Sequence, residues 1–140
     1  MPFEYLDHTA DIGIRGIGKT VEEAFCEAAR AIFNLMVDLE EIVPEKAIHV
    51  TVEARQLDLL LVEWLSALLV KKDLEGLLLA RFHVELREME NGFSLRGVGW
   101  GEPLDLKRHR PKTEVKGVTY AGLRVQREDE QWLAQCVVDI

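Results

Sequence analysis

The stretch from Leu57 to Val70 is almost continuously apolar and constrains the fold more than any other segment. Its leucines, valines, alanine and tryptophan cover nearly the whole circumference of a helix predicted from Leu57 to Lys71. A helix that is apolar on all sides must be covered on most of them. We therefore expect this helix deep in the core, covered by a sheet and by another helix. It is too short, and with Asp58 and Glu63 too polar, to span a bilayer.

Another helix is predicted from Val21 to Val37, where apolar residues follow helical spacing. Thr20 and Glu23 form a capping-box pair at its start, with the hydroxyl facing the amide of the third helical residue. This helix therefore has a defined beginning and one apolar face for the core.

The remaining segments are predicted to be strands. IHVTVEA at 48–54 and RFHVELREM at 81–89 alternate with the period of two that is typical of strands. YLDHTADIGIRGIG at 5–18 reads as one or two short strands with a turn, and the other strand segments are FSLRGVGWG at 93–101, GVTYAGLRVQ at 117–126 and WLAQCVVDI at 132–140. Turns at 90–92 and at 127–130 predict two hairpins. Strands and helices do not alternate regularly, so the pattern predicts one α+β domain over residues 1–140. We expect two helices, one deeply buried, packed with a largely antiparallel sheet system.

The charge of the chain argues against some functions. Its net charge of −8 makes direct high-affinity nucleic-acid binding unexpected, since phosphate neutralisation needs clustered Lys and Arg. An acidic surface suits a basic protein partner or a cation instead. The N-terminus has no basic region followed by an apolar core, so we expect a cytoplasmic protein without membrane association. Cys26 and Cys136 are expected to be small buried hydrophobes, although a disulfide between them stays open.

Three polar segments carry residues suited to chemistry. LDHTAD at 6–11 has two carboxylates, an imidazole and a hydroxyl, but it is also compatible with an ordinary polar turn. GEPLDLKRHRPKTEVK at 101–116 reads by composition as a solvated connection, although loops of this length in small domains are often functional. Asp139 and Ile140 place a side-chain carboxylate beside a terminal carboxylate. The sequence contains no phosphate-binding loop, GxSxG, HExxH or Cys/His cluster.

Taken in order, these segments resemble the archease family. The resemblance rests on HTADIG at 8–13, GEPLDLKRH at 101–109, EVKGVTYAGLRV at 114–125 and VVDI at 137–140, and it runs from about Phe3 to Ile140. One departure is visible, because the family pattern usually reads VKAVTYHGL. This chain has Gly117 and Ala121 in place of that alanine and histidine, so no role of the histidine is carried over.

The resemblance implies an accessory protein and not a stand-alone enzyme. Archeases partner the RtcB-type tRNA-splicing ligase, promote its guanylylation, restore the spent ligase and can broaden its nucleotide use. The family binds a metal through the aspartate of HTAD, the penultimate aspartate and the terminal residue. The ligands implied in this sequence are Asp11, Asp139 and Ile140.

Elementary electrostatics agrees with a cation at these three residues. Two unit charges about 5 Å apart repel by roughly 3 kcal/mol at an effective dielectric constant of about 20. Three clustered carboxylates therefore either take up a proton or bind a cation. Ligands that are all oxygen favour Ca²⁺, Mg²⁺ or Mn²⁺ over Zn²⁺. We expect Ca²⁺ in a crystal and Mg²⁺ or Mn²⁺ in the cell.

Four further residues are candidates for contacts near such a site. His8 is expected to orient a ligand by hydrogen bonding more than to bind the metal itself. Lys107, His109 and Lys116 are candidates for contact with phosphate or with the acidic rim of a ligase cleft.

Two other functions stay open at this point. A small divalent-metal-dependent phosphoesterase or nucleotide hydrolase would use Asp11 and Asp139, although no general base is evident beside them. A chaperone-like binding module with a structural metal is the third reading.

Overall fold

The computed structural model describes residues 2–7 and 11–140. Within them the chain forms two α-helices, seven strands and a short 3-10 helix, so the predicted α+β fold is confirmed. The elements are β1 (Phe3–Asp7), β2 (Asp11–Gly18), α1 (Val21–Met36), η1 (Leu39–Glu41), β3 (Lys46–Ala54), α2 (Leu57–Glu75), β4 (Leu77–Met89), β5 (Gly92–Pro103), β6 (Gly117–Glu128) and β7 (Gln131–Asp139).

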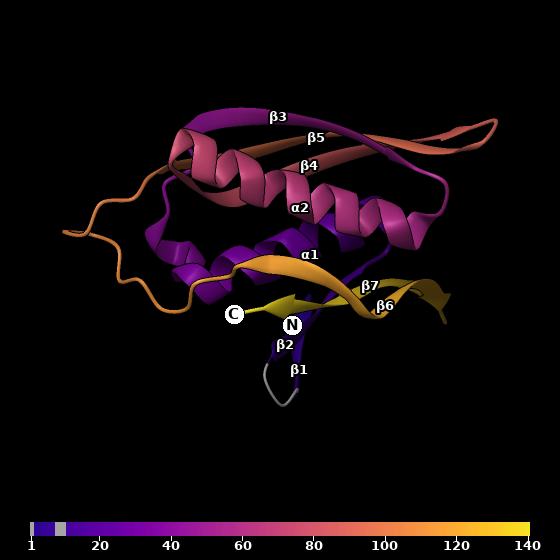
Figure 1. Ribbon diagram of the computed structural model, residues 1–140, viewed down its shortest axis with the longest axis horizontal. Coiled ribbons are helices and arrows are strands. Elements are labelled where there is room, and N and C mark those ends of the chain that lie inside the picture. The colour runs from indigo at the N-terminus through magenta and orange to yellow at the C-terminus, as the bar shows by residue number, and fades with distance from the viewer. Residues whose placement is uncertain (1, 8–10) are drawn as a thin grey trace.

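The strands form two antiparallel sheets, and both helices lie between them (Figure 1). The strand order of the first sheet is β1-β2-β7-β6, and that of the second is β3-β5-β4. Strands β2 and β7 are neighbours in the middle of the first sheet although they come from opposite ends of the sequence. This pairing decides which candidate residues meet.

Helix α1 begins with the predicted Thr20 cap, and Glu23 reaches back to Lys19, one residue before the cap. The Thr20 hydroxyl accepts a hydrogen bond from the Glu23 N–H at 3.1 Å, and the Glu23 carboxylate accepts one from the Lys19 N–H at 2.8 Å. The helix ends at Met36, one residue before the predicted end. Its small buried residues Ala24, Ala28, Ala29 and Ala31 allow it to lie close against β2.

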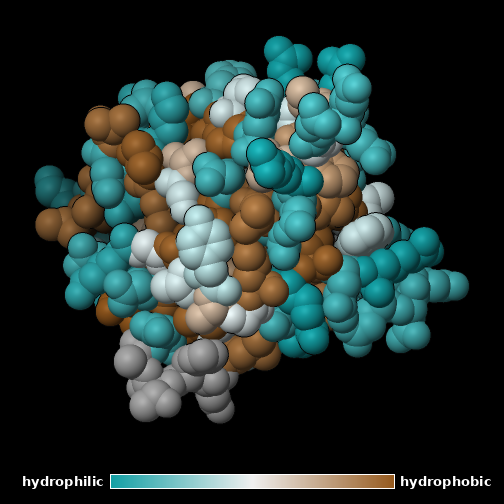
Figure 2. Space-filling view, turned by 45° about the vertical axis from the view of Figure 1, so that its right-hand side comes forward, coloured by the Kyte–Doolittle hydropathy of each residue, from teal (hydrophilic) through white to brown (hydrophobic). Residues whose placement is uncertain are grey.

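Helix α2 is less completely covered than its sequence predicts. Its buried residues pack against strands of both sheets and contact α1 only slightly; they are Leu60, Leu61, Val62, Trp64, Leu65, Leu68 and Leu69. Leu59, Val70 and Leu74 are 36%, 56% and 76% exposed, so one stripe of the helix faces solvent. Apolar side chains emerge between polar ones on the face shown in Figure 2. The expected cover by the first helix is present, since the Trp64 indole N–H donates to the carbonyl of Phe25 in α1, but most of the cover comes from the two sheets.

The end of α2 also differs from the prediction. The helix continues to Glu75, about one turn beyond the predicted end at Lys71. Gly76 then adopts a φ of 65°, and its N–H donates to the carbonyl of Lys72 at 2.8 Å. A left-handed glycine of this kind is a common helix stop, because it carries no Cβ to clash.

Both predicted hairpins are present. In the hairpin of β4 and β5, Met89 pairs with Gly92 across Glu90 and Asn91. In the hairpin of β6 and β7, Glu128 pairs with Gln131. Neither helix in the described part of the chain is long and apolar enough to cross a membrane.

The two cysteines are free thiols, so they form no disulfide with each other. Burial raises the pKa of both Cys26 and Cys136 to about 12, which keeps these sulfurs protonated and unreactive at neutral pH.

Candidate metal centre

The first sheet brings Asp11 and Asp139 together. Asp11 is the first residue of β2, Asp139 is the last residue of β7, and the antiparallel register pairs them directly. Directly opposed residues have Cβ atoms about 4.5–5.5 Å apart and share one face of the sheet. Asp139 is exposed and Asp11 is half-buried, so the pair is accessible from solvent. Two like charges placed in this way are destabilising unless a cation lies between them.

Ile140 follows directly after this pair. Its side chain is partly buried against the hydrophobic core, which fixes the chain beside Asp139. On the other side of β7, Gly117 of β6 pairs with Asp139, and the Lys116 N–H donates to the Asp139 carbonyl at 2.7 Å. The last strand is thus held from both sides where the candidate ligands lie.

The described residues contain no group of three His, Cys, Asp or Glu side chains that would hold a metal ion. Asp11 and Asp139 are the two predicted side-chain ligands that the structure brings together, and the carboxylate of Ile140 as a third ligand stays a prediction. His8 lies outside the described residues.

The other candidates lie on the loop of residues 104–116 and differ in their exposure to solvent. Lys107 and Lys116 have exposed side chains, so both are available for contact with phosphate or protein. His109, in contrast, is only 1% exposed. His109 is predicted to contact phosphate or a partner, but its side chain is enclosed by the protein.

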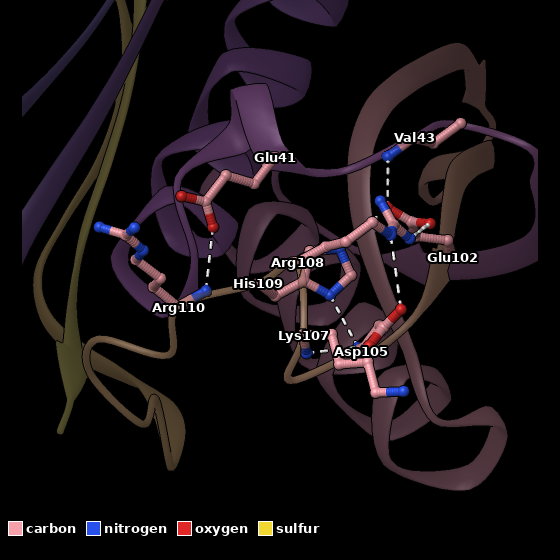
Figure 3. A network of polar contacts seen from close by, with 8 residues as sticks. All are labelled: Glu41, Val43, Glu102, Asp105, Lys107, Arg108, His109 and Arg110. Atoms are coloured by element: carbon pink, nitrogen blue, oxygen red, sulfur yellow. Dashed lines mark hydrogen bonds and ion pairs between the residues drawn. The ribbon is translucent and has the colours of Figure 1, made fainter.

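The ring of His109 is fully engaged by its neighbours (Figure 3). Its Nδ1 accepts a hydrogen bond from the Asp105 N–H at 2.8 Å, so the proton of the neutral ring resides on Nε2. That Nε2 lies 2.9 Å from Oε2 of Glu102, to which it donates. Both nitrogens are used inside the loop, which makes His109 a structural residue.

Glu102 is the centre of this network, and it is 5% exposed. Its carboxylate makes a two-pronged ion pair with the Arg108 guanidinium and accepts a hydrogen bond from the Val43 N–H at 2.7 Å. The Arg108 guanidinium, followed by the Val43 N–H and His109, lowers the pKa of Glu102 from 4.5 to about 2 against the opposing effect of burial. The carboxylate thus stays ionised, as a buried anion with several charge-assisted partners can.

Sequence reasoning missed Glu102 and Arg108. Glu102 stands at the end of a strand between glycine and proline, where an acid ordinarily indicates a solvated turn. Arg108 and His109 follow Glu102 by six and seven residues, and this was the one signal of an ionic network in the sequence. The backbone between them is irregular, so the spacing alone does not predict that the three side chains meet. The network therefore becomes visible only in the folded chain.

The fold and this site define a class of small α+β proteins, with two antiparallel sheets around two helices and a pair of opposed aspartates at the end of the central strands. Comparison with known proteins agrees with that class. The family model of the archease protein family matches residues 3–140. The archease of Thermococcus gammatolerans is 42% identical over 139 residues, covering 99% of this chain and 98% of that protein. The archease of Methanopyrus kandleri is 41% identical, with all of both chains covered.

Two solved structures share the fold. The solution structure of protein 1598 of Methanobacterium thermoautotrophicum superposes with a TM-score of 0.88 at 32% identity, with 99% of each chain covered. The crystal structure of an archease, described as a possible chaperone, from Thermotoga maritima superposes with a TM-score of 0.60 at 19% identity, covering 96% of this chain and 94% of that one. The chain described here belongs to the archease family.

Proposed function

We propose that this protein is a metal-binding accessory protein that activates an RtcB-type tRNA-splicing RNA ligase by promoting its guanylylation and turnover. The observation that carries the proposal is the direct cross-strand pairing of Asp11 with Asp139 in a chain that belongs to the archease family. Carboxylates directly opposed across a sheet repel each other, so this pairing is unfavourable unless a cation lies between them.

The residues at this position fit a hard divalent cation. Two aspartate side chains and the main-chain carboxylate of Ile140 form a donor set of oxygen atoms alone, which suits Ca²⁺, Mg²⁺ or Mn²⁺. A cation held by so few protein ligands would offer open coordination positions to the phosphate oxygens of a nucleotide. The exposure of Asp139 leaves room for such a ligand on the solvent side.

The donor set also favours an accessory role over hydrolysis of phosphate esters. Among the side chains that the structure describes, which do not include those of residues 7–10, no group of three His, Cys, Asp or Glu could hold a metal ion. A hydrolase needs a general base beside its metal or a metal-bound hydroxide in a dry pocket. The exposed Asp139 suits neither requirement and suits a site that is completed by a partner.

Asp11→Asn and Asp139→Asn are expected to abolish ligase activation without harming the fold. Each change removes one negative charge at nearly constant shape, so the metal-free protein keeps its stability or gains some. Affinity for Mn²⁺ should fall by about tenfold or more, which corresponds to only about 1.4 kcal/mol. The measurements are calorimetric titration of Mn²⁺, thermal unfolding without metal, and GTP-dependent guanylylation of the purified ligase at limiting activator.

The matched control is Asp129→Asn, which makes the same chemical change at the turn of the β6–β7 hairpin, away from the candidate site. It should leave metal affinity and activation unchanged. A large loss of metal-free stability with activation retained would identify Asp11 and Asp139 as structural acids. GTP hydrolysis by the purified protein alone would support the hydrolase in place of the accessory role.

Extending the chain beyond Ile140 is expected to weaken divalent-ion binding by about tenfold or more. A peptide bond turns the terminal carboxylate into a neutral amide carbonyl, so one full charge leaves the proposed ligand set. An extension before Met1 should have no such effect. Titration of Ca²⁺ or Mn²⁺ into both proteins decides the matter, and equal affinities would exclude Ile140 as a ligand.

A further inference from the structure

The connection between β5 and β6 is a long irregular loop on the outside of the protein. Residues 104–116 contain no helix or strand, and in Figure 1 they project beyond the two sheets at the end of the molecule where β7 finishes. Irregular loops of this length are uncommon in a small domain unless they have a function.

The first half of the loop is held in one conformation by buried polar contacts (Figure 3). Glu102 and His109 are 5% and 1% exposed, and their hydrogen bond closes the chain on itself around Asp105 and Arg108. Buried ionic groups of this kind add little net stability compared with apolar residues. What they do here is fix the backbone of a surface loop.

The second half of the loop is tied to the body of the protein by its backbone. The N–H groups of Lys112 and Thr113 donate to the carbonyls of Met36 and Leu35 at the end of α1, at 2.8 and 3.0 Å. The Lys116 N–H donates to the carbonyl of Asp139, and Val115 is buried. The loop therefore connects the buried Glu102–His109 pair at one end to the candidate metal centre at the other.

This fixed loop presents apolar side chains to solvent. Leu104 is 50% exposed and Leu106 is 73% exposed, on either side of Asp105. The Asp105 carboxylate accepts the Lys107 N–H at 2.9 Å, which holds the turn that carries Leu106. Apolar groups in a preformed backbone gain free energy when a partner covers them and lose little chain entropy in doing so.

The charge of the loop differs from that of the rest of the protein. Residues 104–116 contain five Lys or Arg residues and two acidic residues, whereas the whole chain carries a net charge of −8. The side chains of Lys107 and Arg110 are exposed and form no ion pair with a described residue. A partner surface complementary to this loop therefore has an apolar pocket for the leucines and acidic residues around it for the basic side chains.

We infer that residues 104–110 are the docking element by which this protein binds its ligase, with Leu106 inserted into an apolar pocket that has an acidic rim. The inference rests on the proposed function, since it names the surface through which the same accessory protein acts. The Glu102–His109 pair holds the backbone of this element in the conformation that presents Leu106. The loop that carries this element also reaches the candidate metal centre, since the Lys116 N–H donates to the Asp139 carbonyl.

The test compares Leu106→Glu with Leu74→Glu. Both leucines are highly exposed, 73% and 76%, but Leu74 lies on α2 outside the loop, so the two variants share the chemical change and differ only in position. Binding to the purified ligase is measured by calorimetry without RNA, together with Mn²⁺ affinity and thermal unfolding. Leu106→Glu should weaken ligase binding at least tenfold and leave Mn²⁺ affinity and melting temperature unchanged. Activation should return at saturating concentrations of the variant, unlike that of Asp139→Asn.

The outcomes separate this inference from the proposed function. Equal ligase affinity of Leu106→Glu and wild type would overturn the docking element and leave the accessory role standing. Equal losses in Leu106→Glu and Leu74→Glu would overturn it too, since the effect would not be specific to the loop. A loss seen only when RNA is present would assign the basic loop to phosphate contact and overturn docking on the protein. Failure of the wild type to bind or activate the ligase would overturn both proposals.

Discussion

Replacing Trp64 with alanine is expected to lower the free energy of unfolding by about 3–5 kcal/mol, a large share of the roughly 5–15 kcal/mol typical of a domain. Trp64 has no exposed surface, and its indole N–H donates to the carbonyl of Phe25 at 3.1 Å. Its ring lies edge-on to that of Phe82. A Cβ at Gly97 would lie only 2.2 Å from this indole, so the sheet is shaped around the tryptophan.

Urea-induced unfolding of Trp64→Ala and wild type measures this change. Leu74→Ala is the matched control on the same helix, because Leu74 is 76% exposed and should change stability by less than about 0.5 kcal/mol. A cost for Trp64→Ala as small as that of the control would show that α2 is not part of the core.

Gly16→Ala is expected to cost about 3 kcal/mol or to prevent folding, at or above the upper end for overpacking. A Cβ at Gly16 of β2 would lie 2.1 Å from the carbonyl oxygen of Ala24 and 2.4 Å from the nitrogen of Ala28. Both atoms belong to the backbone of α1, which does not yield as a flexible side chain does. The helix would have to move away from the sheet and open the core between them.

The control for Gly16→Ala is Gly117→Ala in β6 of the same sheet. A Cβ at Gly117 meets no heavy atom within 4 Å, so this variant should unfold at the same urea concentration as wild type. Circular dichroism and urea unfolding of both variants provide the comparison. A stable, fully folded Gly16→Ala protein would mean that α1 is not seated on β2 as closely as the structure has it.

Local signals explain why so much of the fold follows from the sequence. The capping box of Thr20 and Glu23, the alternation in the strands and the Asn91–Gly92 turn each depend on residues close together in the chain, so they predict elements and hairpins well. The cover of α2 depends on how two sheets are placed around it, which no local pattern records. Val70 and Leu74 are apolar like their neighbours, and only the assembled sheets leave them facing solvent.

The residues of the candidate site could be predicted from the sequence for a different reason. Asp11 and Asp139 were predicted as partners through a family resemblance, and the strand register now places them opposite each other. Their metal binding stays a prediction. His109 shows the limit of that approach, because a histidine among basic residues suggests a contact with phosphate, whereas its burial depends on Glu102 folding over it.

The position of β7 has a consequence for how the protein is made. This strand comes last in the sequence, yet it lies between β2 and β6 in the first sheet. The second sheet and α2 come from consecutive segments, so they can form early in synthesis. One edge of β2 stays unpaired until β7, its distant partner in the sequence, has been made. Until β7 leaves the ribosome, that edge is a template for wrong pairing between chains. A chain that ends before β7 would lack Asp139 and would leave that edge of β2 unpaired.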